Sequence, residues 1–241
     1  MRVGIKMGPV NSEEYVGKIS FDADFFEVYA RKGYDCDFLL KYNKPVMVHI
    51  PHSGDQVNFA DSQKKEINLQ NLDWALKLAN KFKSQVIVFH PGRVESEFCS
   101  IENAINFIKE HHDKRLHVEN VPLKGKRFKS IGGSFEDIKR IMQEADVGFC
   151  LDMAHAIEYA KAAGLEAAPF IKKMLSLKPD YFHLTDTPLE EDTKTPHLNL
   201  GEGKLDLKLM KSLLPNNALI ALETPGDAKK QKKEIAFMKK I

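Results

Sequence analysis

The sequence has little cysteine and no long apolar run. Three cysteines, Cys36, Cys99 and Cys150, form no paired pattern, so we expect reduced thiols rather than a disulfide framework. No run approaches the roughly 18 apolar residues that a membrane helix requires, and the first residues lack a secretory signal pattern. These absences predict a cytoplasmic protein without a membrane partner.

The sequence also lacks an excess of charge of either sign. Its 36 basic and 34 acidic residues give a formal charge of +2, which by itself does not indicate a nucleic-acid partner. No repeat, low-complexity stretch or linker divides the 241 residues, and the hydrophobic content of 43% is sufficient for a sizeable core. We therefore expect residues 1–241 to form one domain.

Eight short segments have the apolar, β-branched or aromatic composition of buried strands. Between them, apolar residues recur at helical spacing, as Leu72, Leu76 and Ala79 do. Alternating strands and helices predict parallel strands joined by crossovers, and eight of them in a chain near 250 residues predict a (β/α)₈ TIM barrel. The predicted strands are Arg2–Lys6, Phe25–Tyr29, Val46–His49, Gln85–His90, Arg115–Glu119, Val147–Asp152, Tyr181–His183 and Ala218–Glu223.

Six of these strands end on a residue that can bind a divalent metal. Active sites of (β/α)₈ barrels lie at this end of the strands, and alternation along a strand points each final residue inward. Histidine and carboxylate together suit zinc, manganese or iron(II) better than calcium or magnesium. The six residues are His49, His90, Glu119, Asp152, His183 and Glu223; His52 is an alternative to His49, whose strand parity fits better.

Short motifs surround these residues, in order from about Val46 to Pro225, which is most of the chain. The motifs are FHPG (Phe89–Gly92), VEN (Val118–Asn120), CLDMAH (Cys150–His155), HLTD (His183–Asp186), HxxxGEG (His197–Gly203) and LETP (Leu222–Pro225). Together they resemble the endonuclease IV family of the xylose isomerase-like barrels.

The resemblance implies two or three divalent ions, zinc above all and manganese as the alternative. One ion would be held by His49, His90 and Glu119, and Glu119 would bridge to a second held by Asp152, His183 and Glu223. His155 and His197 would hold a third. In that family the ions activate water to cut DNA 5′ of an abasic site. Glu119 and Glu223 are the expected catalytic carboxylates.

The sequence departs from the family pattern in two places. Thr195 stands where the family has an aspartate ligand of the third ion, so that site is predicted to be weak or empty. The first two strands also lack the family's glycine-rich opening and its DNA-penetrating loop. Near the barrel mouth, Arg93, Lys124 and Arg127 are expected to bind substrate phosphate, with a solvated basic loop as the alternative.

Two other functions stay open. A single-metal sugar isomerase or epimerase would use Glu119, Asp152, His183 and Glu223 as ligands, with the two glutamates moving a proton beside a carbonyl. A non-catalytic binding module on the same barrel is the second. Three further histidines (His49, His90, His197) have no general use in a one-metal enzyme. They favour a metal-dependent phosphoesterase, with abasic DNA as its most specific substrate.

Overall fold

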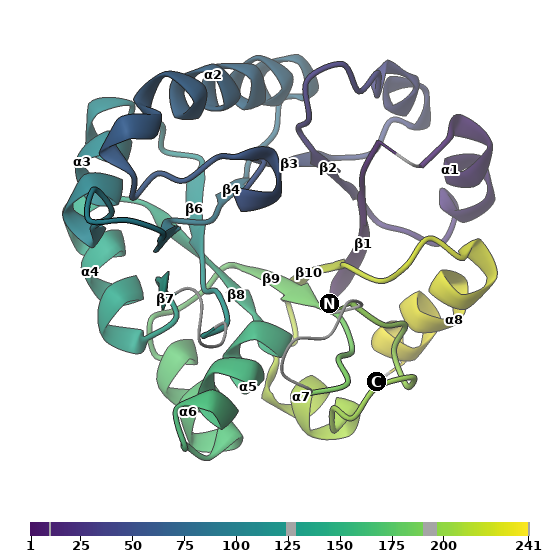
Figure 1. Ribbon diagram of the computed structural model, residues 1–241. Coiled ribbons are helices and arrows are strands. Elements are labelled where there is room, and N and C mark those ends of the chain that lie inside the picture. Colours follow the sequence, from purple (N-terminus) through teal and green to yellow (C-terminus); the bar gives the residue numbers. More distant parts are fainter. Residues whose placement is uncertain (10, 124–128, 190–196, 241) are drawn as a thin grey trace.

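A computed structural model shows a closed barrel of eight parallel strands inside a ring of helices (Figure 1). The structure describes residues 1–9, 11–123, 129–189 and 197–240. The predicted TIM barrel is confirmed, and strand β1 pairs with β10 to close it. The barrel strands are β1 (Arg2–Met7), β2 (Phe26–Tyr29), β3 (Val46–His49), β4 (Ile87–Phe89), β6 (Leu116–Glu119), β8 (Gly148–Asp152), β9 (Tyr181–Leu184) and β10 (Leu219–Leu222).

Helices cover the outside of the barrel and connect most of the strands (Figure 1). Between β2 and β3 the connection contains only a short 3₁₀ helix (Asp37–Tyr42), whereas two helices lie between β8 and β9. No helix in the described part of the chain is long and apolar enough to cross a membrane. The helices are α1 (Glu13–Ile19), α2 (Lys65–Phe82), α3 (Ile101–Glu110), α4 (Phe135–Ala145), α5 (Met153–Ala162), α6 (Ala167–Leu175), α7 (Leu207–Leu213) and α8 (Ala228–Lys239).

Alternation along the strands separates two apolar cores. Outward-facing residues such as Ile5 and Val28 pack in a large core with residues of the helices. Inward-facing residues form a second core inside the barrel, which contains Phe25, Val88 and Cys150. Val88 and Cys150 therefore face inward, as alternation from His90 and Asp152 predicts, and an apolar layer lies beneath the polar residues at the strand ends.

Gly4 is needed where β1 passes the ring of Phe25. A Cβ atom at Gly4 would lie 2.4 Å from two atoms of that ring. We expect Gly4→Ala to reduce the free energy of unfolding by about 1–3 kcal/mol, because overpacking forces neighbouring side chains out of their rotamers. Urea unfolding would measure the loss. Gly8→Ala is the matched control, since a Cβ there meets nothing within 4 Å. Equal stability of the two variants would contradict tight packing of Gly4 against Phe25.

A small antiparallel sheet, which the sequence analysis did not predict, stands outside the barrel. It pairs β5 (Gly92–Val94) with β7 (Lys129–Ile131). Residues from both strands, Arg93 and Ser130, line the cavity at the barrel mouth together with His90 and Glu223. The sheet therefore forms one wall of the candidate site.

Candidate metal centre

The barrel brings all six predicted strand-end residues to one place. His49, Glu119 and Asp152 are the last residues of their strands, and His90 and Glu223 follow β4 and β10 directly. His183 lies inside β9, where Asp152 is its register partner. Four of these residues are buried, the Glu223 side chain is 7% exposed, and His90 is about one-fifth exposed.

Two further charged residues, Lys6 and Glu27, complete the cluster. They are register partners on β1 and β2. Lys6 Nζ lies 2.5 Å from Glu223 Oε1 and 3.7 Å from Glu27 Oε1. Side chains alternate across β1 and β2 as they do across the strands that carry the histidines. This alternation also points Lys6 into the barrel, and it was the sequence signal that could have identified Lys6 as a residue of the site.

The first ligand group surrounds one oxygen of Glu119. His49 Nε2 lies 3.0 Å and His90 Nε2 2.9 Å from Glu119 Oε2. His49 Nδ1 lies 2.7 Å from the carbonyl oxygen of Ile50, which can only accept, so Nδ1 carries the hydrogen. In the neutral ring the Nε2 lone pair then faces a carboxylate oxygen. Such a contact between two lone pairs is repulsive unless both atoms share a cation, and a divalent metal ion would be such a cation.

The second ligand group uses the other oxygen of Glu119. One ligand atom each from Glu119, Asp152, His183 and Glu223 lie within 4.8 Å of one another. Three buried atoms of this group, Glu119 Oε1, Asp152 Oδ2 and His183 Nδ1, have no hydrogen-bond partner among the described residues. Unsatisfied buried acceptors destabilise a protein. Their convergence fits a divalent cation.

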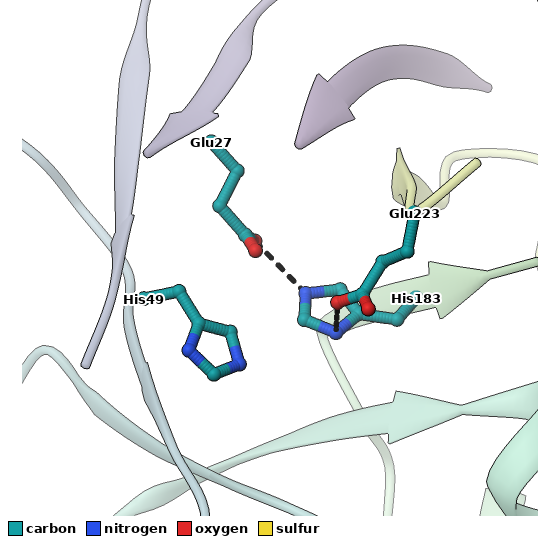
Figure 2. Close-up of side chains that lie close together, drawn as sticks. All are labelled: Glu27, His49, His183 and Glu223. Carbon is teal, nitrogen blue, oxygen red and sulfur yellow. Dashed lines mark hydrogen bonds and ion pairs between the residues drawn. The ribbon is translucent and has the colours of Figure 1, made fainter. Parts of the chain in front are cut away.

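Glu27 fixes the orientation of the His183 ring. Its Oε2 lies 2.8 Å from His183 Nε2, which donates the hydrogen bond. The opposite nitrogen, Nδ1, then presents its lone pair 2.7 Å from Glu223 Oε1 and 3.4 Å from Glu119 Oε1. Figure 2 shows Glu27 and Glu223 each joined to a different nitrogen of the His183 ring. A carboxylate behind a ligand histidine sets its tautomer in many metal sites.

We expect Glu27→Ala to weaken zinc binding by about 10–100-fold, the usual effect of removing such a supporting carboxylate. Competition with a zinc-binding dye would measure the affinity. Glu27→Gln is the matched control, because its amide oxygen can still accept from His183 Nε2. An alanine variant with wild-type zinc affinity would show that Glu27 does not orient the ligand.

Burial and neighbouring charges move the pKa values of two ligands in opposite directions. Burial lowers the pKa of His90 to about 4, although the Glu119 carboxylate opposes this shift. The neutral ring that results is the form that binds a metal. Burial raises the pKa of Asp152 to about 7, with His155 acting against the rise and Glu119 adding to it. The three carboxylates of the second ligand group, Glu119, Asp152 and Glu223, therefore favour a bound cation.

The two histidines assigned to a third ion lie near the cluster. His155 Nδ1 is 3.0 Å from the Asn120 carbonyl oxygen and 3.2 Å from Glu119 Oε1. His197 Nδ1 is 3.6 Å from Glu223 Oε2. In the described ranges, neither joins a group of three candidate ligands. Thr195 lies outside these ranges, so a third ion stays a prediction.

A loop held by Asp186 carries His197. The buried Asp186 carboxylate accepts four backbone hydrogen bonds of 2.9–3.1 Å. A Cβ at Gly203 would lie 2.2 Å from its Oδ1, so the loop can approach only with glycine there. Asp186 thus anchors the GEG loop rather than binding a ligand. The four donors are the N–H groups of Thr187, Gly201, Gly203 and Leu205.

The remaining predicted residues that the structure describes, His52 and Arg93, line the cavity. His52 stacks on His90, with ring centroids 4.8 Å apart and an interplanar angle of 11°, and the candidate ligand groups contain His49 instead. Arg93 lines the cavity, and its Nε donates to Glu95 Oε1 at 2.6 Å. Lys124 and Arg127 lie outside the described residues.

The chain belongs to the xylose isomerase-like TIM barrel family, whose sequence profile matches residues 37–241. Among curated proteins, it is 29% identical over 251 aligned residues to one named "Probable endonuclease 4" from Thermosipho melanesiensis, covering 94% of this chain and 85% of that protein. A second protein of that name, from Thermosipho africanus, is 28% identical and covers 83% of this chain and 78% of its own. The resemblance to endonuclease IV is confirmed.

Solved structures of two enzyme types have the same fold. Endonuclease IV from Thermus thermophilus aligns with a TM-score of 0.75 at 17% identity, covering 99% of this chain and 97% of that one. A D-tagatose 3-epimerase-like protein aligns with a TM-score of 0.74 at 20% identity, covering 98% and 96%. These similarities establish the fold and leave the reaction to be argued from the site.

Proposed function

We propose that the protein is a divalent-metal-dependent phosphoesterase with at least two ions bridged by Glu119. The observation that carries this proposal is the position of one buried carboxylate between two ligand groups. Glu119 Oε2 faces His49 and His90. Glu119 Oε1 faces His183 and His155. Zinc is the proposed metal, since the ligands mix imidazole and carboxylate.

The residues of the centre divide into ligands and cavity-lining groups. His49, His90 and Glu119 would hold one ion, and Glu119, Asp152, His183 and Glu223 the other. Two ions held there would supply Lewis-acid chemistry, namely activation of water near neutral pH and stabilisation of charge on the attacking and leaving oxygens of a phosphodiester. His155 and His197 line the cavity beside them, where they can hold substrate oxygens or a third ion.

DNA containing an abasic site is the most specific substrate that we propose. Support comes from the relatives named endonuclease 4, which align over most of this chain. The two-group ligand arrangement is the local support, because hydrolysis of a phosphodiester benefits from a cation on both the attacking and the leaving oxygen. Arg93, Lys124 and Arg127 remain the proposed phosphate-binding residues.

A single-metal sugar epimerase is the second candidate. The group of Glu119, Asp152, His183 and Glu223 suffices for one ion, and an epimerase-like structure aligns as well as endonuclease IV does. In that reaction Glu119 and Glu223 would act as acid and base. The group of His49 and His90 on Glu119 would then have no ion to bind, and this favours the phosphoesterase.

A paired assay distinguishes the two reactions. Zinc- or manganese-loaded protein would be incubated with a DNA duplex carrying one abasic-site analogue, with the same duplex without it, and with D-tagatose. We expect metal-dependent cleavage of the abasic duplex only. Epimerisation of the sugar without DNA cleavage would replace the proposal with the second candidate.

A further inference from the structure

Among the described residues, Lys6 is the one lysine or arginine whose side chain pairs with the carboxylates of the cluster. Strand β1 places it between β2 and β10, so it lies beside Glu27 on one side and Glu223 on the other. Its side chain is 14% exposed and lines the cavity that also contains His155 and His197. The ammonium therefore lies where the proposed metal centre meets the space for a substrate.

The hydrogen bonds of Lys6 leave capacity for another acceptor. An ammonium group carries three donors. Among the described residues, only Glu223 Oε1, at 2.5 Å, accepts a hydrogen bond from it. Glu27 Oε1, at 3.7 Å, is an ion-pair partner beyond hydrogen-bond range. An anionic oxygen entering the cavity would find an unsatisfied N–H group.

The charge of the centre makes this ammonium important for an anionic substrate. Four carboxylates (Glu27, Glu119, Asp152, Glu223) and Lys6 together carry three negative charges when the histidines are neutral. Two divalent ions would change that total to one positive charge, and removal of Lys6 would change it to zero. A phosphodiester carries one negative charge, so Lys6 provides the surplus that attracts it.

We propose that Lys6 is a substrate-binding residue whose ammonium binds a non-bridging phosphate oxygen beside the second metal site. The inference rests on the proposed phosphoesterase function and adds a residue to it. A point charge with rotatable donors is a common phosphate ligand. The same group would give little advantage to an uncharged sugar.

Binding of inorganic phosphate to the zinc-loaded protein tests the role of Lys6 without requiring turnover. Isothermal titration would compare wild type with Lys6→Met, which removes the charge and keeps the length, and with Lys6→Arg, which keeps the charge. Lys32→Met is the matched control, because Lys32 is exposed and its ammonium contacts only Gln70 among the described residues. Elemental analysis would give the metal content of each variant.

We expect Lys6→Met to raise the dissociation constant for phosphate by about tenfold or more, equivalent to about 1.4 kcal/mol, with unchanged metal content. Lys6→Arg should retain most of the affinity and Lys32→Met all of it. Unchanged phosphate affinity in Lys6→Met would overturn the inference, as would loss of a metal ion in that variant. Tighter zinc binding with unchanged phosphate affinity would also overturn it, by showing that Lys6 only competes with the ion for Glu223.

The proposed function can fail separately. Wild-type protein that binds phosphate through Lys6 but cleaves neither abasic DNA nor bis(4-nitrophenyl) phosphate would contradict the phosphoesterase and support the phosphate site. With a cleavable ester, the Lys6→Met variant should raise KM more than it lowers kcat, because a binding contact made throughout the reaction has been removed.

Discussion

Glu119→Gln is expected to lose both metal ions and all measurable hydrolysis while the barrel stays folded. Each oxygen of Glu119 faces a different ligand group, and both are buried. An amide keeps the size of the side chain but offers one neutral oxygen in place of a shared negative charge. The loss of activity should exceed about 100-fold, the upper end for residues that only support a ligand.

Metal content and circular dichroism of the Glu119→Gln variant would check this expectation. Glu202→Gln is the matched control, since Glu202 is an exposed carboxylate paired with Lys230. The control should keep its metal and its activity. A Glu119→Gln variant that still binds two ions per chain would show that this residue is not the bridge.

Glu223→Gln is expected to separate the two ions. Glu223 contacts His183, Lys6 and His197. It shares the second ligand group with Glu119, but among the described residues it makes no hydrogen bond or ion pair with His49 or His90 of the first group. The variant should therefore keep the first ion, lose the second and have no measurable activity, with the fold largely intact. Loss of the negative charge also frees Lys6 from its closest carboxylate.

Titration of the Glu223→Gln variant with zinc, followed by activity at saturating metal, would measure both effects. One tight equivalent in place of two is the expected result. Normal activity in this variant would contradict the proposed site. Loss of both ions would instead indicate that the two ligand groups assemble only together.

The fold and the candidate ligands could be predicted from the sequence because both depend on local patterns. Strand composition and helical spacing predicted the eight barrel strands. Parity along each strand then pointed the last polar residue inward, as it does for His49 and Glu119. The boundaries were less certain, and His90 and Glu223 lie just beyond their strands, because a strand ends where its pairing ends rather than at a residue type.

The roles that the sequence left open depend on contacts between distant segments. Glu27 and His183 are 156 positions apart, and only the closed barrel shows that one orients the other. Lys6 meets Glu223 because β1 closes on β10. The sheet of β5 and β7 was missed because its strands have three residues each, too few for a periodic pattern. A charged residue at the end of a predicted strand therefore indicates where the candidate metal centre lies. The residues that contact it can be identified only from the structure.

The most direct test of the central claim is the metal content per chain. Protein purified without chelator and without a metal-affinity tag would be analysed by elemental mass spectrometry alongside an activity assay. Two equivalents of zinc or manganese are predicted, or three if His155 and His197 hold a further ion. A single equivalent in fully loaded, active protein would contradict a centre bridged by Glu119.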